Sequence, residues 1–138
     1  MLRKFATNPN KNKFIDDSLS VRFTLYDLWK ELKDAKEVHK EEPFYMFVQA
    51  NRIDETYPKD EKVLVQGIMD LYYINKNNEL VLVDYKTDYV QKGEEQKLID
   101  KYKEQLNLYK EALENSLGRK VDKVLIYSTW IGKVECHN

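Results

Sequence analysis

A single cysteine, Cys136, stands in a chain of 138 residues. One thiol cannot close an internal disulfide, and it cannot supply the four thiolates of an iron–sulfur cluster or a Cys₄ zinc site. The chain has only four glycines and contains no G-x-x-x-x-G-K-[ST] phosphate-binding loop of a nucleotide-driven motor. The composition therefore indicates a reducing compartment, the cytoplasm, and excludes a motor within these residues.

Long apolar runs are also missing. The longest aliphatic run, Leu80 to Val83, is far too short to span a bilayer, and the first 20 residues have no apolar core of a signal peptide. We therefore expect no membrane association. Lys and Arg number 23 against 24 Asp and Glu, a net charge of −1. This balance excludes a strongly basic nucleic-acid binder, but it leaves open a nucleic-acid enzyme that needs only a local basic path.

What the chain does contain is enough apolar material for one domain. Hydrophobic residues make up 42% and aromatic residues 12%. Residues 1–19 carry turn residues without hydrophobic periodicity, which predicts a poorly ordered lead-in before a domain at 20–138. An apolar stripe predicts a helix over 24–39 with Thr24 as its N-cap. We expect Trp29 and Trp130 in the core and the lysines of this helix on a solvated face; the alternatives are base-stacking tryptophans and a path for DNA along the lysines.

The remaining elements alternate between strands and one further helix. The pattern predicts a strand at 44–48, a loop at 51–61, a hairpin of strands 62–74 and 79–87, a helix at 94–117 and strands at 121–130 and 133–136. Gly118 is expected to end the second helix. The order α-β-β-β-α-β-β predicts a single mixed α/β domain.

Two acids occupy unusual places in the predicted hairpin. Asp70 lies inside a β-rich run, and Asp84 follows four consecutive aliphatic residues. A turn centred on Asn77 pairs residues whose numbers add up to 154, as those of Asp70 and Asp84 do. In that register their Cβ atoms would be roughly 5 Å apart, whereas a half-residue shift of the turn would place them on opposite faces.

Two carboxylates at such a distance repel each other unless a cation lies between them, and hard oxygen ligands suit Mg²⁺ or Mn²⁺. Lys86 projects from the same strand face as Asp84, two residues on. The three residues Asp70, Asp84 and Lys86 thus have the parts for metal-assisted phosphodiester hydrolysis. The plainer alternative is a strand-end salt bridge between Asp84 and Lys86, with Asp70 on a sheet edge.

A second signal lies on the predicted helix at 94–117. Gln105 and Tyr109 are four residues apart and therefore share one helix face. Gln105 interrupts an otherwise apolar surface. The plainer alternative is a glutamine at the rim of the core beside a core tyrosine.

These residues carry a family resemblance. Gly67-Ile68-Met69-Asp70, Asp84-Tyr85-Lys86-Thr87 and Gln105-x-x-x-Tyr109 resemble the G-[IV]-x-D, D-Y-K-T and Q-x-x-x-Y motifs of RecB-type nucleases in the PD-(D/E)xK superfamily. The run ending in Asp88 looks most like the C-terminal nuclease domain of AddA-type helicase–nucleases. Lys40-Glu41-Glu42-Pro43-Phe44 also resembles the R-E-x-P-F segment of that family.

The resemblance implies a restriction-endonuclease-like core and specific roles. Asp70, Asp84 and the backbone carbonyl of Tyr85 would bind Mg²⁺ or Mn²⁺, and Lys86 would be the catalytic lysine. Gln105 and Tyr109 would contact DNA or steady the site. Glu41 would be an accessory residue. The partners implied are DNA, expected to be single-stranded, the helicase part of the same parent chain and an AddB-type subunit.

One departure concerns histidine. Such nucleases usually take a histidine ligand from an earlier helix, whereas His39 lies directly against the R-E-x-P-F-like segment and His137 near the end of the chain. Both are interpreted as surface histidines. The chain is therefore expected to be a C-terminal fragment of a longer helicase–nuclease, with weak activity or none. The alternatives are an inactive nuclease-fold domain that binds DNA or docks another protein chain, and a stand-alone phage-type exonuclease.

Overall fold

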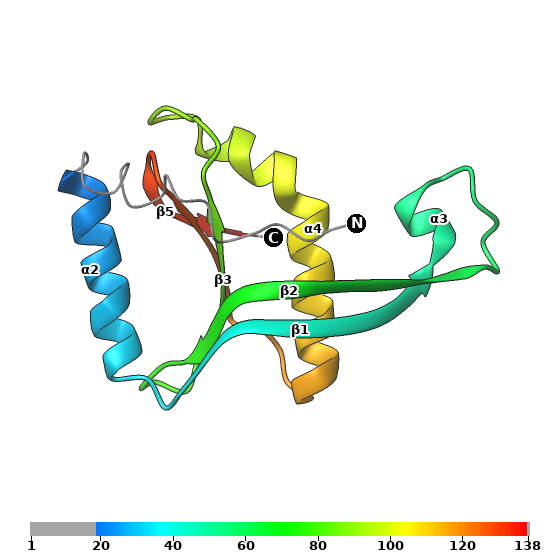
Figure 1. Ribbon diagram of the computed structural model, residues 1–138, viewed down its shortest axis with the longest axis horizontal. Helices are drawn as coiled ribbons and strands as arrows, with labels where there is room; N and C mark the ends of the chain where they lie inside the picture. Colours follow the sequence, from blue (N-terminus) through cyan, green and yellow to red (C-terminus); the bar gives the residue numbers. More distant parts are fainter. Residues whose placement is uncertain (1–18, 138) are drawn as a thin grey trace.

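The computed structural model describes residues 19–137, with side chains from residue 25 onward, and its centre is a five-stranded sheet (Figure 1). The strand order is β1-β2-β3-β4-β5, and only β3 and β4 run parallel. The strands are β1 (Glu37–Gln49), β2 (Lys62–Ile74), β3 (Leu80–Lys86), β4 (Lys123–Ser128) and β5 (Gly132–Cys136). The mixed α/β class is therefore confirmed.

Helices cover both faces of the sheet. The helices are α2 (Leu19–Lys33), α4 (Glu95–Leu117) and the short α3 (Ala50–Ile53). Side chains of β3 alternate between the two faces, as a strand requires. Leu80 and Leu82 belong to the core beneath α4, whereas Val81 and Val83 pack with Leu28 of α2. β3 is therefore buried on both faces.

The hairpin of β1 and β2 is much longer than its contact with β3. β1 pairs with β2 from end to end, but β2 pairs with β3 only over residues 71–74. Beyond that point the two strands bend away as a ribbon that crosses α4 and carries α3 at its far end (Figure 1). Glu41, which the register places opposite Asp70, has a positive φ of 52°. The bend therefore lies at these two acids.

Two predicted chain reversals are confirmed. The turn after β2 is held by Asn75, whose Oδ1 accepts hydrogen bonds from the backbone N–H groups of Asn77 (3.0 Å) and Glu79 (2.9 Å). Gly118 ends α4 in the left-handed conformation, with φ 67°, and its N–H donates to the carbonyl of Glu114. Each reversal uses a residue type suited to it.

The predicted helix at 24–39 was wrong at both ends. Thr24 lies inside α2 instead of capping it, and Val38 lies in β1. Residues 37–43 form a strand because β2 pairs with them, although their own sequence favours no strand. Trp29 was also predicted wrongly: it is 55% exposed, because Leu25, Leu28 and Leu32 form the stripe that faces the sheet.

Smaller boundaries differ as well. The expected loop at 51–61 includes most of α3. β4 begins two residues later than expected and ends at Ser128, whose Oγ accepts hydrogen bonds from the N–H groups of Trp130 (3.1 Å) and Ile131 (3.2 Å) in the turn that follows. The lead-in expected at 1–19 lies outside the described residues except for Leu19, which begins α2. No helix in the described part of the chain is long and apolar enough to cross a membrane.

Gly67 shows a tight contact between the ribbon and α4. It lies opposite Phe44 in the β1–β2 register, and a Cβ at this position would lie 2.9 Å from Phe44 Cε1. The Phe44 ring packs edge-on against Tyr109 of α4, with centroids 5.1 Å apart. The absence of a side chain at Gly67 thus lets this ring fill the space between ribbon and helix.

We predict that Gly67→Ala lowers the free energy of unfolding by about 1–3 kcal/mol, because overpacking forces the Phe44 ring to move. Urea denaturation measures this change. In a Phe44→Leu background the same alanine should cost less, since the clashing ring atoms are gone. Equal costs in the two backgrounds would contradict this account of Gly67.

Candidate active site

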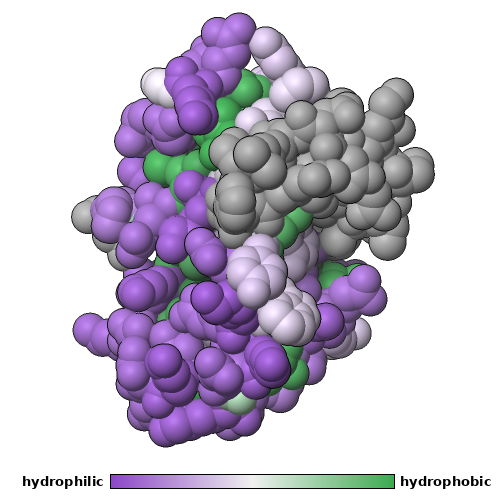
Figure 2. Space-filling model, turned by 90° about the vertical axis from the view of Figure 1, so that its left-hand side faces the viewer, coloured by the Kyte–Doolittle hydropathy of each residue, from purple (hydrophilic) through white to green (hydrophobic). Residues whose placement is uncertain are grey.

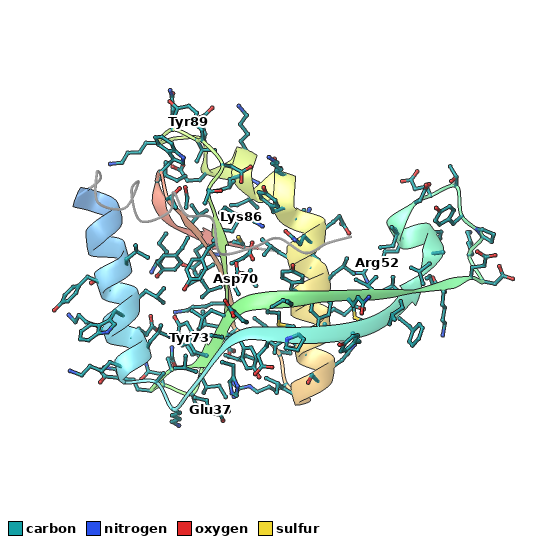
Figure 3. The ribbon with its side chains drawn as sticks, in the orientation of Figure 1. Glu37, Arg52, Asp70, Tyr73, Lys86 and Tyr89 are labelled. Atoms are coloured by element: carbon teal, nitrogen blue, oxygen red, sulfur yellow. The ribbon has the colours of Figure 1, made fainter. Side chains whose placement is uncertain are left out.

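The candidate site lies where β2 leaves β3 (Figure 3, Asp70 and Lys86). The paired residues, from Leu71 with Val83 to Ile74 with Leu80, have numbers that add up to 154, so the predicted register is confirmed. Asp70 and Asp84 occupy the next position, where the ladder has stopped. Asp70 Oδ2 instead accepts a hydrogen bond from the backbone N–H of Tyr85 at 2.9 Å. The Asp70 side chain thus bridges the two strands where backbone pairing ends.

Asp84 has no exposed surface. Its Oδ2 lies 2.6 Å from Lys86 Nζ, which makes an ion pair by distance, but the geometry is not that of a hydrogen bond. Neither carboxylate oxygen accepts a hydrogen bond from the described residues. Burial raises the pKa of Asp84 to about 6, Lys86 opposes this rise, and the nearby carboxylate of Asp70 adds to it. A buried acid whose oxygens accept no hydrogen bond from the described residues is suited to a further cation besides Lys86.

Lys86 is also fully buried. Its Nζ donates a hydrogen bond to Gln105 Oε1 at 3.0 Å and lies 3.9 Å from the centroid of the Tyr102 ring. Both partners come from α4, whereas Asp84 comes from the same strand as Lys86. The ammonium group is therefore held between the sheet and the helix.

Gln105 and Tyr109 form the next contact outward from the lysine. Gln105 Nε2 donates a hydrogen bond to Tyr109 Oη at 3.1 Å. Tyr109 has no exposed surface, and its ring packs against Phe44. The structure therefore brings Gln105 directly to Lys86 and links Tyr109 to it through Gln105.

Tyr85 points its side chain to the opposite face of the sheet, where its ring meets Tyr127 edge-on at 6.4 Å. Its backbone N–H faces Asp70. The carbonyl of a strand residue points to the same neighbour as its N–H, so this oxygen lies on the Asp70 side. The available oxygen donors are thus two carboxylates and one carbonyl.

The other acids and histidines contribute less. Among the side chains that the structure describes, at residues 25–137, no group of three or more His, Cys, Asp or Glu is arranged to hold a metal ion. His39 stacks on Tyr72 with centroids 4.5 Å apart and pairs with Glu37, so it does not join the set. Glu41 is exposed at the bend.

Sequence reasoning missed Tyr102 and Asp88. Tyr102 counted only as part of the apolar face of its helix, and Asp88 only as the end of a motif. The structure places the Tyr102 ring under Lys86, and Tyr102 Oη donates to both carboxylate oxygens of Asp88 at 2.8 and 2.9 Å. Tyr102 lies three residues before Gln105, so helical spacing alone would have placed them on one face.

Comparison with known proteins bears on the family of this chain. Residues 3–130 match the model of the PD-(D/E)XK nuclease superfamily. The chain belongs to this nuclease superfamily. Nucleases of the PD-(D/E)XK superfamily generally use divalent metal ions, and the resemblance seen in the motifs is confirmed.

Among the relatives of this PD-(D/E)XK chain are ATP-dependent helicase/nuclease subunits of the AddA type. The one from Clostridium kluyveri is 37% identical over 131 residues, which cover 92% of this chain and 10% of the relative. The one from Clostridium perfringens strain 13 is 36% identical over 141 residues, covering 96% and 11%. The chain thus spans about a tenth of the length of these relatives.

The fold is also similar to that of a solved protein, the crystal structure of SSO0001. The two chains are 15% identical, with a TM-score of 0.50, and the match covers 92% of this chain and 61% of that one. This likeness supports the fold.

We predict that Lys86→Met destabilises the metal-free protein by about 3–5 kcal/mol at neutral pH, because it leaves the buried Asp84 without its cation. Chemical denaturation measures the loss. The double variant Asp84→Asn/Lys86→Met should recover part of it, since both buried charges are then removed. Lys76→Met, at an exposed lysine, is the matched control. A double variant no more stable than Lys86→Met alone would argue against the buried ion pair.

Proposed function

We propose that this chain is a metal-dependent deoxyribonuclease domain that hydrolyses phosphodiester bonds at the site of Asp70, Asp84 and Lys86. The observation that carries the proposal is the buried Asp84, whose two oxygens accept no hydrogen bond from the described residues although a second acid and a lysine lie beside it. A buried carboxylate without hydrogen bonds lowers the stability of a fold, so its presence here indicates a role other than stabilising the core.

The donor set fits a divalent cation. The carboxylates of Asp70 and Asp84 and the carbonyl of Tyr85 are hard oxygen ligands, which Mg²⁺ and Mn²⁺ prefer. When bound, such an ion supplies Lewis-acid polarisation of a phosphoryl oxygen and lowers the pKa of water. Asp70 holds the end of β3 in place through Tyr85 N–H, so that the donors keep their positions.

Lys86 is the positively charged side chain of the proposed site. Its ammonium group faces Asp84 and is fixed by Gln105. In this position it can stabilise the negative charge that develops on a phosphate or orient the attacking water. Tyr109, buried behind Gln105, steadies this arrangement and does not contact DNA. Glu41, exposed at the same bend, is the proposed accessory residue.

The relatives suggest the setting of this activity. ATP-dependent helicase/nuclease subunits of the AddA type contain a segment similar to this chain. We therefore infer that the substrate is a single DNA strand delivered by a helicase part of the same polypeptide, in the cytoplasm, and that the partner is an AddB-type subunit. The near-zero net charge agrees with a domain that receives its strand from elsewhere.

Cleavage of a labelled single-stranded oligonucleotide tests the activity. With Mg²⁺ or Mn²⁺ we expect weak but measurable cleavage by the unaltered chain and a loss of at least about 100-fold in Asp84→Asn and in Lys86→Met, since each removes a group that acts on the reacting phosphate. Asp60→Asn, at an exposed loop acid, is the matched control and should keep full activity. No cleavage by the unaltered chain would favour an inactive DNA-binding or docking domain.

Metal binding has its own readout. Because a ligand that binds only the folded state stabilises it, Mn²⁺ at 100 times its dissociation constant should add about 2.7 kcal/mol of stability. Thermal denaturation should therefore show a rise in Tm for the unaltered chain and for Asp60→Asn, and none for Asp84→Asn. An equal rise in all three proteins would place the ion elsewhere.

A further inference from the structure

The ammonium group of Lys86 is bounded on one side by an aromatic ring. Its Nζ lies 3.9 Å from the centroid of Tyr102, in addition to its contacts with Asp84 and Gln105. A lysine has three N–H donors, and a cation over a ring face is attracted by the ring quadrupole, most strongly when it is desolvated. Because Lys86 has no exposed surface, its contact with the Tyr102 ring is desolvated and is therefore among the stronger cation–π contacts.

The Tyr102 ring is itself held in place. Its hydroxyl donates to Asp88, which also pairs with Lys101 at the surface. Burial favours the neutral form of Asp88, but the hydrogen bonds from Lys101 and Tyr102 outweigh it and lower the pKa of this carboxyl. A phenol that donates to a carboxylate has a more electron-rich ring, which strengthens its attraction for a cation.

The contact of Lys86 with Tyr102 also differs from its contact with Asp84. Asp84 is a proposed metal ligand, so its carboxylate would interact with both the metal ion and Lys86. Gln105 and Tyr102 lie on α4 and have no such second role in the proposed site. The two α4 contacts therefore fix the lysine independently of the carboxylate.

We propose that Tyr102 and Asp88 are positioning residues for Lys86: the Tyr102 ring holds the ammonium group through a cation–π contact, and Asp88 fixes that ring from outside the site. This inference rests on the proposed nuclease function and assigns two further residues to it. Neither residue touches the reacting phosphate.

The test compares Tyr102→Leu, which removes the ring, with Tyr102→Phe, which keeps the ring and loses the bond to Asp88. We expect kcat to fall about 10- to 30-fold in Tyr102→Leu with KM unchanged. The fall in Tyr102→Phe and Asp88→Asn should be about threefold. Tyr57→Leu, at an exposed tyrosine beyond α3, is the matched control. A Tyr102→Leu variant with an unchanged kcat, or with KM altered and kcat kept, overturns the proposal.

Nuclear magnetic resonance provides a readout independent of activity. The side-chain protons of Lys86 should show upfield ring-current shifts in the unaltered chain and in Tyr102→Phe, and ordinary lysine shifts in Tyr102→Leu. Shifts that are the same in all three proteins would disprove the contact. If the unaltered chain cleaves no DNA, the nuclease proposal fails, and the NMR comparison still decides whether the ring holds Lys86.

A different observation concerns the outer surface of α2. Tyr26 and Trp29 are 54% and 55% exposed and stack on each other with centroids 5.9 Å apart. Lys30 Nζ lies 5.5 Å from the Tyr26 ring centroid, and Lys33 Nζ lies 5.4 Å from that of Trp29. We call these four residues the α2 stripe. Figure 2, viewed from the α2 side, shows pale side chains of intermediate hydropathy among hydrophilic ones, with hydrophobic areas visible between them.

Basic and acidic side chains lie on different sides of α2. A helix turns by about 100° per residue, which places the four members of the α2 stripe within about 100° of one another. The acids Asp27, Glu31 and Asp34 fall on the neighbouring flank, and the leucines face the sheet. The stripe thus carries aromatic rings and positive charge without an acid among its members.

We infer that the α2 stripe binds an unpaired nucleic-acid strand, with bases stacked on the aromatic rings and phosphates on the lysines. Such a combination accepts any base sequence, since every base has a flat face. A duplex hides its bases and would not use the rings. The inference rests on the proposed function and adds a contact outside the candidate active site.

Fluorescence anisotropy with a labelled oligothymidine in EDTA tests this binding without cleavage. Tyr26→Ala/Trp29→Ala should weaken binding by about 10-fold or more, and Lys30→Gln/Lys33→Gln should reduce its salt dependence. Tyr45→Ala/Phe47→Ala removes two equally exposed aromatic residues from β1 and should have no effect. No binding by the unaltered chain, or an equal loss in both aromatic pairs, overturns the inference. Unchanged binding by the Tyr26/Trp29 variant also overturns it. The nuclease proposal is judged separately, by cleavage with metal.

Discussion

The separation of β2 from β3 at Asp70 is the constraint on which the candidate site depends. While the two strands pair, their backbone groups bind each other and leave no place for a ligand. Where the ladder stops, the carboxylate of Asp70 takes the N–H of Tyr85. Asp70 and Asp84 are both buried at this point, where the backbone ladder between their strands has ended. The long pairing of β1 with β2 makes this possible, because β2 keeps a partner after leaving β3.

Burial then gives the site its electrostatics. Asp84 and Lys86 have no exposed surface, and two such charges cost stability unless each is compensated. The α4 side chains compensate the lysine through Gln105 and the Tyr102 ring. Asp84 is paired with Lys86 at 2.6 Å, but neither of its oxygens accepts a hydrogen bond from the described residues. Two carboxylates thus lie near one ammonium group, and a divalent cation would balance the remaining negative charge.

The sequence patterns predicted correctly those turns and helix ends that depend on the residue types at the turn or end itself. The turn at Asn75–Asn78 fixed the hairpin register, and Gly118 fixed the end of α4, so both could be read from single residues. The start of β1 could not, because residues 37–43 become a strand only through pairing with β2. Trp29 was misplaced for a related reason: the sheet selects the leucine stripe of α2, and an adjacent aromatic is left outside. The site residues were brought together as expected, whereas Tyr102 and Asp88 emerged only from three-dimensional contacts.

The alternation of β3 has a consequence for how this site can vary. Asp84 and Lys86 act through side chains on the α4 face, whereas Tyr85 between them offers only its backbone and packs its ring against Tyr127 on the other face. A substitution at Tyr85 therefore changes the packing with Tyr127 but cannot remove the carbonyl. The side chain at this position can therefore change with the core packing beneath α2, while the backbone carbonyl that the site uses stays in place.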